Sequence, residues 1–529
     1  MDESGRPIAG AVVSDGHNRV FSAEDGTFYF YTAADSILVQ RLGYLPRRVA
    51  FRVIAKPIVL KAEPVTLPKV TVTQSARDLL AMPPDRISLP IDPDRHYYSA
   101  GEIISSTPSA STGGVRLAGE SQGISILGNL SRHTLVLLDG IPLNPDGASY
   151  DISLLEAGEI ESIELIKNNA SVYGGSSAIG GIVSITTKKG AHQSGEKFAL
   201  STEAGSFGYA KNTFTFETAW ETWKLRLHLA NLDTDNDFPY RMPDWWSADS
   251  TATRENNAKR QNSISASFSI RVNKARILLR SDLSSFRRGL PGTVNFLEVY
   301  RNAFLEGSAG RNQITVDSDF LGCEASTLLW LNLDRTLYDN TRAPLTVYLS
   351  KYRQTMRDLG LRGSLGKELT FGSRISFTAG FAGEAGTRHY VNSDLLGAQA
   401  DLDHYSRFAN ASLKGGLKLD LDDMIWDSSA AGRYDYGNRE ENFSWRLESS
   451  LRRVGRIETT LGATLGTSFS LPSPYDLYWR GDSQALGNPD LESESSRGWQ
   501  FWLQNRLEPF SLKAAFHHNE IENLIQWRQ

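Results

Sequence analysis

The chain has 529 residues, 40% of them hydrophobic, and a mean hydropathy of −0.33, which leaves room for several soluble domains or for one large β-barrel with appendages. No apolar run reaches about 18 residues, so the sequence predicts no membrane-spanning helix, although barrel strands, which show lipid only every second side chain, also keep average hydropathy low. The net charge of −5 comes without a dense basic patch and argues against a nucleic-acid partner, and the single Cys323 excludes an intrachain disulfide and a cysteine-rich metal site.

Residues 1–61 are predicted to form a small β-sandwich. The segments AGAVVSD, GTFYFYT and SILVQRLGY are rich in β-forming residues, and turn signals such as Asp25-Gly26 separate them. Met1 is followed at once by DESGRPIAGAVV, so no export signal is visible. We therefore expect that a signal was removed from this sequence or that the true start lies upstream.

Residues 62–78 are predicted to form a linker, because Pro64 and Pro68 disfavour regular structure. Near its end lies a β-branched run that could offer its backbone to the edge of another protein's sheet. The same run could instead be part of a β-rich linker or one further strand of the sandwich. The residues of this run are Val70, Thr71, Val72 and Thr73.

Residues 79–193 combine strand patterns with clustered glycines. Two predicted strands, Ile124–Leu127 and Thr134–Leu138, are followed by Asp139-Gly140, a dipeptide typical of hairpin turns. Ile160–Ile166 alternates as a half-buried strand does. Four further glycines permit tight bends and close backbone packing: Gly174, Gly175, Gly180 and Gly181.

Residues 194–529 change to the alternation of barrel strands. In one run, three leucines alternate with three polar residues: Leu225, Leu227 and Leu229 with Lys224, Arg226 and His228. The same alternation recurs within 263–270, 375–381, 457–465 and 499–504. Repeated at irregular spacing with polar loops between, it indicates a transmembrane β-barrel, although a soluble all-β protein could show it as well.

Several of these segments resemble one known family. Residues 140–190, GIPLNPDGASYDISLLEAGEIESIELIKNNASVYGGSSAIGGIVSITTKKG, closely resemble the second half of the plug domain of TonB-dependent outer-membrane receptors. Residues 470–504, with the motif GNPDL, resemble late barrel strands and a loop of the same family, and RGLPG at 288–292 resembles one of its early loop motifs. Residues 1–61 resemble the carboxypeptidase-regulatory-like domain that often precedes such plugs, and Val70–Thr73 resembles the TonB box, which pairs with a strand of TonB.

The resemblance implies an all-β-dominated fold with an N-terminal β-sandwich, an α+β plug domain and a transmembrane antiparallel β-barrel. The implied boundaries are 1–61 for the sandwich, 62–78 for the linker, 79–193 for the plug and 194–529 for part of the barrel. Most related plugs carry Arg-Gly where this chain has Leu127-Gly128, so an ion pair between plug and barrel is not expected at that position.

No group of residues is predicted to be a catalytic or cofactor site. The segment YGGSSAIGG at 173–181 lacks the Gly-Lys-Ser/Thr of a nucleotide-binding loop and the GxGxxG of a dinucleotide loop. The nine histidines show no HExxH spacing, and Glu161 and Glu164 lie on opposite faces of their strand. Ser176 and Ser177 lack a GxSxG elbow. We therefore expect neither an enzyme nor a cofactor.

The predicted function is TonB-driven uptake through the bacterial outer membrane, with outer-membrane lipid and TonB as partners and the N-terminal domain in the periplasm. The expected ligand is a small molecule, an iron–siderophore complex or cobalamin, with an oligosaccharide or peptide as the alternative class. A surface β-protein that binds glycans or acts as an adhesin, and a secreted glycoside-acting enzyme, remain open as other functions. The chain stops soon after GNPDL and ends in Gln529, so we expect an open barrel of fewer than about 22 strands.

Overall fold

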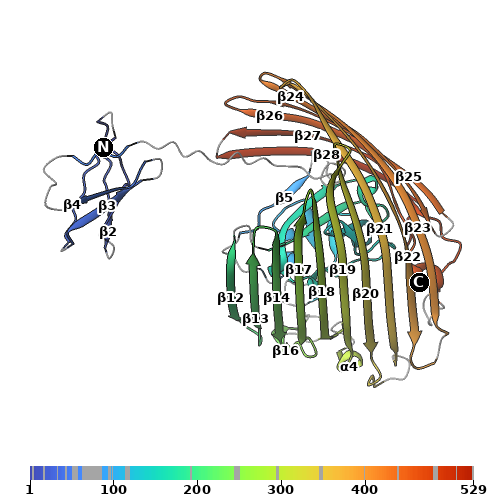
Figure 1. The fold of residues 1–529 in the computed structure, drawn as a ribbon. Coiled ribbons are helices and arrows are strands. Elements are labelled where there is room, and N and C mark those ends of the chain that lie inside the picture. The colour runs from blue at the N-terminus through green and yellow to red at the C-terminus, as the bar shows by residue number, and fades with distance from the viewer. Residues whose placement is uncertain are drawn as a thin grey trace. The chain divides into compact units, whose positions relative to one another are not determined.

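The chain forms two compact units in the computed structural model, Met1–Thr73 and Gln74–Gln529 (Figure 1). The predicted TonB-box segment Val70–Thr73 lies outside the described residues. The structure describes residues 1–526 apart from these positions: 3–4, 16–17, 33, 42–43, 51–56, 62–85, 93–96, 98, 114–119, 191–193, 243–250, 293–296, 345–348, 398–399, 438–439, 480–485 and 508.

The first unit contains a four-stranded antiparallel sheet in the order β2-β1-β3-β4. Its strands are β1 (Val12–Ser14), β2 (Arg19–Phe21), β3 (Ser36–Gln40) and β4 (Arg47–Ala50). Val13, Ile37 and Leu60 form the centre of its hydrophobic core. The predicted relation to the carboxypeptidase-regulatory-like domain and the predicted domain boundaries remain predictions.

The second unit begins with the plug, which we define as residues 86–190. Its main sheet has the order β5-β10-β11-β8-β9, with β11 parallel to β8 and the other pairs antiparallel. Ile163, Leu165 and Val183 lie in a core that is closed off by α2 (Ala100–Ile104). The plug strands are β5 (Ile87–Leu89), β6 (Ala110–Thr112), β7 (Ile124–Ile126), β8 (Thr134–Leu138), β9 (Ile141–Pro142), β10 (Ile160–Lys167) and β11 (Gly181–Thr187).

A single antiparallel sheet of fifteen strands curves around the plug (Figure 1). Its strands follow chain order from β12 to β28, and within the described residues these two edge strands each have one neighbour. The fold class predicted from the sequence is confirmed. The strands are β12 (Gly195–Ala204), β13 (Ala210–Ala219), β14 (Trp223–Thr234), β17 (Lys259–Val272), β18 (Ala275–Gly289), β19 (Phe304–Phe320), β20 (Cys323–Asp339), β21 (Lys351–Phe371), β22 (Ile375–Asp394), β23 (Leu402–Leu421), β24 (Met424–Gly437), β25 (Glu440–Arg453), β26 (Glu458–Ser470), β27 (Glu494–Leu507) and β28 (Phe510–Glu522).

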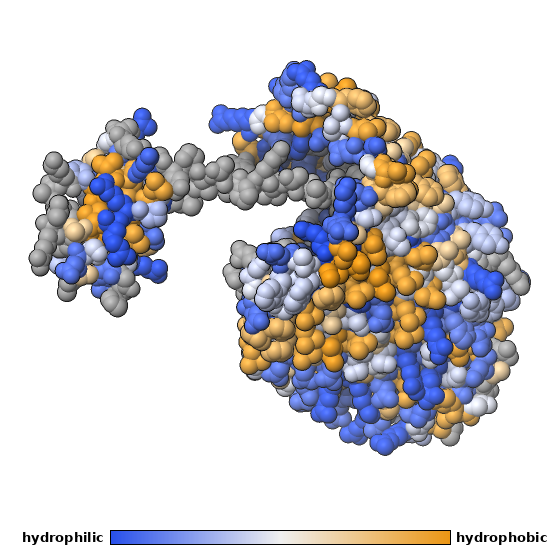
Figure 2. Space-filling model, viewed as in Figure 1, coloured by the Kyte–Doolittle hydropathy of each residue, from blue (hydrophilic) through white to orange (hydrophobic). Residues whose placement is uncertain are grey.

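The two faces of this sheet differ in polarity because successive side chains point to opposite sides. Along β17, Ile264 is 46% exposed on the outer face, whereas Ser263 and Ser265 are buried against the plug side. Figure 2 shows the outer hydrophobic side chains gathered in a band across the strands. None of the described helices is long and apolar enough to span a bilayer.

The two ends of the sheet also differ. At the turn end, neighbouring strands are joined by short connections such as 273–274, 321–322 and 422–423. At the opposite end, which we call the loop end, most connections are longer, although 438–439 is not, and two of the long ones include the short helices α4 (Leu297–Tyr300) and α5 (Pro474–Tyr478). The long connections are 235–258, with the hairpin β15 (Pro239–Arg241) and β16 (Thr251–Thr253), 290–303, 340–350, 395–401 and 471–493.

Candidate functional site

The contact between the plug and the inner face of the sheet contains several buried charged side chains. The alternation of β14 that places Leu229 outside places Arg226 and His228 inside, where they are 5% and 3% exposed. Arg280 on β18 is 4% exposed for the same reason. A buried charge is costly unless it is paired and hydrogen-bonded, so these side chains need partners on the plug or on neighbouring strands.

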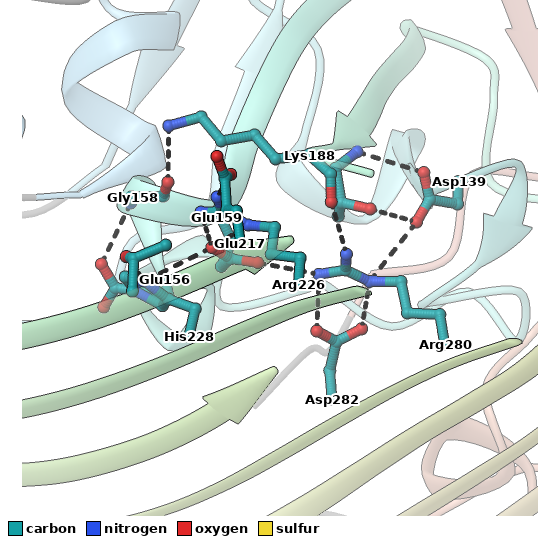
Figure 3. A network of polar contacts seen from close by, with 12 residues as sticks. Asp139, Glu156, Gly158, Glu159, Lys188, Glu217, Arg226, His228, Arg280 and Asp282 are labelled. Atoms are coloured by element: carbon teal, nitrogen blue, oxygen red, sulfur yellow. Dashed lines mark hydrogen bonds and ion pairs between the residues drawn. The ribbon is translucent and has the colours of Figure 1, made fainter. Parts of the chain in front are cut away.

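Glu159 is the plug residue on which two sheet arginines converge (Figure 3). It ends the turn η4 (Ala157–Glu159), directly before β10, and is 4% exposed. Its Oε1 accepts hydrogen bonds from Arg226 Nη2 at 2.5 Å and Nε at 3.2 Å, and its Oε2 lies 3.4 Å from Arg280 Nη2. Arg226 also contacts Glu217, and Arg280 donates to Asp282 at 2.6 Å. One plug carboxylate thus joins strands β14 and β18.

Glu156, three residues earlier, forms a second ion pair with the sheet. Its Oε1 lies 2.7 Å from Lys211 Nζ on β13 and also accepts the Gly158 N–H at 3.0 Å, which caps η4. Burial alone would raise the pKa of Glu156, but Lys211 and the Gly158 hydrogen bond outweigh it and hold the pKa below its usual range. Glu156 is therefore ionised at neutral pH, and the pair is a true salt bridge.

The RGLPG motif supplies a third pair. Arg288 Nη1, at the end of β18, lies 2.6 Å from Asp151 Oδ2 in the plug. The other carboxylate oxygen of Asp151 accepts backbone N–H groups of Gln122 and Ser153 at 2.9 and 3.1 Å. Burial raises the pKa of Asp151, but Arg288 and these hydrogen bonds lower it more, so the pKa lies below its ordinary value.

The predicted turn residues Asp139 and Gly140 also reach the sheet. They have φ of +50° and +82° and connect β8 to β9, as a type I′ hairpin turn requires. The Asp139 carboxylate accepts the Thr187 hydroxyl at 2.6 Å within the plug and the Gln313 amide of β19 at 3.1 Å. The Gly140 carbonyl accepts Arg362 Nη1 of β21 at 2.9 Å. This turn is therefore a point of attachment as well as a change of direction.

The four predicted glycines lie in a buried bend between α3 (Ser171–Gly174) and β11. A Cβ on Gly181, where φ is +141°, would lie 2.2 Å from the Ile166 carbonyl oxygen. At Gly180 it would lie 2.9 Å from the Asn129 Cβ, and at Gly174 2.4 Å from a Leu135 methyl group. Gly175, with φ of +89°, approaches the guanidinium of Arg433 on β24, where a Cβ would lie 3.1 Å from Nη2.

The same bend is attached to β26 by neutral hydrogen bonds. The Ser171 N–H donates to the Ser468 hydroxyl at 2.9 Å, and the Leu471 N–H donates to the Ser176 hydroxyl at 2.9 Å. The Ser177 N–H donates to the Phe469 carbonyl at 3.2 Å. The plug therefore meets β13–β18 mainly through charges and β26 mainly through hydroxyl and backbone groups.

The position Leu127-Gly128 carries no charge, and Leu127 packs against the hydrophobic core of the plug. A buried pair occurs nearby instead, between His133 Nε2 and Glu494 Oε2 of β27 at 2.8 Å, with both side chains at most 1% exposed. The sequence patterns predicted no role for His133 or Glu494.

Sequence reasoning also missed Glu156, Glu159 and their arginine and lysine partners. The polar residues of each alternating strand could have indicated which side chains face the plug, since Arg226 and His228 lie on the side of β14 opposite the leucines. The three-residue spacing of Glu156 and Glu159 before β10 does not by itself predict a contact with the sheet. Among the described residues, no three His, Cys, Asp or Glu side chains are grouped so as to hold a metal ion.

Two family models match the chain. The model of the TonB-dependent receptor plug domain matches residues 93–182, and the model of the TonB-dependent receptor-like β-barrel matches residues 192–529. Together they cover most of the plug and the whole of the fifteen-stranded sheet.

Curated relatives of the chain include vitamin B12 transporters named BtuB. The protein from Photobacterium profundum is 23% identical over 416 residues, which is 77% of this chain and 62% of the relative. A protein from Vibrio vulnificus is 24% identical over 450 residues, which is 81% of this chain and 65% of the relative. The chain thus spans slightly less than two thirds of the length of these relatives.

Solved structures show the same fold. A mutant of the ferric enterobactin receptor PfeA from Pseudomonas aeruginosa superposes with a TM-score of 0.66 at 17% identity, covering 85% of this chain and 73% of that one. A double mutant of the hemophore receptor HasR from Serratia marcescens gives a TM-score of 0.62 at 13% identity, covering 83% and 73% of the two chains. At these identities the likeness concerns the fold alone.

Proposed function

We propose that this chain, which belongs to the TonB-dependent receptor family, serves the active uptake of a scarce ligand across the bacterial outer membrane. The ligand that we propose is an iron–siderophore complex or cobalamin, the classes named for the similar siderophore receptors and vitamin B12 transporters. The hydrophobic outer band of the sheet would face lipid, and the long connections of the loop end would face the outside, as in other outer-membrane barrels.

The observation that carries this proposal is the buried ionic contact between plug and sheet. Glu159, Glu156 and Asp151 are each paired with a cation of the sheet at 2.5–2.7 Å. A shift of the plug that separated these side chains inside the sheet would leave buried charges without partners, at a cost of about 3–5 kcal/mol for each pair. Passage of a ligand therefore requires work on the plug, which fits an energised transporter better than an open pore.

The work would come from TonB through the segment Val70–Thr73. In Figure 1, β5 lies at the end of the sheet opposite α4, so the chain enters the plug at the turn end. That end would face the periplasm, where TonB acts. A β-branched, extended segment could pair with an edge strand of TonB and transmit a pull to β5.

The test is uptake in a strain that lacks the gene and carries the full-length gene on a plasmid. Radiolabelled cobalamin and a radiolabelled ferric siderophore are offered with and without TonB. We expect accumulation of one ligand only when TonB is present, and surface binding of the same ligand in both strains. Uptake that does not depend on TonB, or the absence of uptake and binding for both ligand classes, would contradict the proposal.

A further inference from the structure

Aromatic side chains gather at the loop end, on the inner face of the sheet and on α5. The Tyr475 and Trp479 rings stack with centroids 4.7 Å apart, and Trp479 meets the edge of Tyr352 at 5.7 Å. Tyr338 stacks on Tyr352 at 6.3 Å. The sixth ring is His404, whose partner is Tyr478 of α5 at 5.1 Å. We call these residues the aromatic rim: Tyr338, Tyr352, His404, Tyr475, Tyr478 and Trp479.

The aromatic rim is open to a ligand. Tyr475 and Tyr478 remain 37% and 36% exposed, although both contact other rings. Tyr338 has the same parity along β20 as the buried Trp330 and Asn332, so it belongs to the inner face. Exposed rings such as these at the loop end attract flat, weakly polar groups, because stacking gains both buried area and aromatic contact.

The charges beneath the aromatic rim are already paired within the protein. Arg388 lies 3.2 Å from Asp146 of the plug and 3.4 Å from Asp358, so two carboxyl groups of the protein already contact its guanidinium. Two further arginines on the inner face are paired in the same way: Arg362 with Glu384 at 2.5 Å and Arg433 with Asp435 at 2.7 Å. A multiply anionic ligand would have to compete with these carboxylates and would be repelled by them.

Helix α5 is also joined to the plug. Asp476 accepts a hydrogen bond from Arg132 of the plug at 2.8 Å and completes a capping box with Ser473. Burial raises the pKa of Asp476, but Ser473 and Arg132 lower it more, so the carboxylate stays charged at neutral pH. A molecule that displaces α5 would therefore act directly on the plug.

We propose that the aromatic rim binds an uncharged ligand that presents flat ring faces, and that it selects against multiply anionic iron chelates. This inference rests on the proposed uptake function, and of the two ligand classes proposed there it favours cobalamin, a corrinoid, over the iron–siderophore complex. A neutral oligosaccharide shares the chemistry of uncharged ring faces, and the experiment separates it from the corrinoid.

The test uses the full chain purified in detergent and intrinsic tryptophan fluorescence as readout, with cyanocobalamin, maltoheptaose and a ferric tris-catecholate as probes. We expect one of the two neutral probes to bind and the tris-catecholate to bind at least tenfold more weakly. Tyr475→Ala should weaken binding of the neutral probe by about two- to tenfold, the range of one aromatic contact. Tyr405→Ala is the matched control, because Tyr405 lies beside His404 on β23 and is 56% exposed.

Tighter binding of the tris-catecholate, an equal effect of Tyr405→Ala and Tyr475→Ala, or no binding of either neutral probe would each overturn the inference. TonB-dependent uptake separates this failure from a failure of the proposed function. If cells take up the anionic chelate in a TonB-dependent manner, the receptor function stands and the inference about the aromatic rim is wrong. If no ligand is taken up with TonB, the proposed function itself is wrong.

Discussion

Replacing Glu159 with glutamine tests whether the charge of Glu159 holds the plug closed against the sheet. The substitution keeps the shape of the side chain and removes the charge that Arg226 and Arg280 share. Removing one partner of a buried pair costs about 3–5 kcal/mol, but Arg226 keeps Glu217 and Arg280 keeps Asp282. We therefore expect a smaller loss, about 2 kcal/mol, in the free energy that keeps the plug closed against the sheet.

Hydrogen exchange of the full chain in detergent measures this loss. About 2 kcal/mol corresponds to roughly 30-fold faster exchange of those β10 amides that exchange when the plug opens, since about 1.4 kcal/mol is a factor of ten. Glu161→Gln is the matched control, because Glu161 lies two residues further along the same segment and is exposed. Equal exchange of β10 in the two variants would refute the reasoning that the Glu159 charge holds the plug.

Three further predictions concern other parts of the chain. Val72→Pro should abolish TonB-dependent uptake but leave ligand binding at the cell surface near normal, because proline removes a donor from the added strand; uptake at the wild-type rate would place the box elsewhere. Gly181→Val should make the plug sensitive to protease and the cell permeable to antibiotics, because a Cβ at Gly181 would lie 2.2 Å from a backbone carbonyl oxygen. Gly113→Val is the control and should have neither effect, because no atom lies within 4 Å of a Cβ at Gly113. The lowered pKa of Asp151 means that its contribution to plug stability is complete above about pH 4 and is lost as the pH falls through the lower folded value. The Asp151-dependent part of plug opening, measured by hydrogen exchange corrected for the intrinsic rate, should therefore be constant from pH 5 to 8 and increase only in stronger acid. Asp151→Asn should reduce this acid step but not remove it, because Glu156 also has a lowered pKa; an acid step of unchanged size would contradict the prediction.

The sequence predicted those features that depend on local rules. Alternation has a period of two residues, so Leu225, Leu227 and Leu229 identify a strand and also its outer face without any knowledge of its neighbours. The turn at Asp139-Gly140 follows from backbone sterics, since only a few residue types accept positive φ. Both predictions required no long-range information, and the fold class built on them is confirmed.

The sequence did not predict which charges would meet. Glu159 lies 67 residues from Arg226 and 121 residues from Arg280, and either arginine could have paired with a carboxylate on its own sheet, as each also does. The alternation shows that Arg226 points inward, but its partner depends on how the plug is rotated inside the sheet. That rotation is set by many contacts at once, so no single motif encodes it.

The position of β10 shows how a pull would act on the plug. The strand begins directly after Glu159, which is held by Arg226 and Arg280, and it ends before a turn whose carbonyls at Lys167, Asn168 and Asn169 all accept hydrogen bonds from Arg446 of β25. Arginines of the sheet thus hold both ends of β10 through hydrogen bonds. The first plug strand, β5, is attached to β10 by the three backbone pairs from Ile87 to Leu89 and by the ion pair of Arg86 with Glu164 at 3.4 Å, between the two arginine contacts. We therefore expect a pull that arrives through the linker to separate β5 from β10 before force reaches the arginine contacts at either end of β10. β5 would leave the plug sheet first, while these charged contacts remain intact.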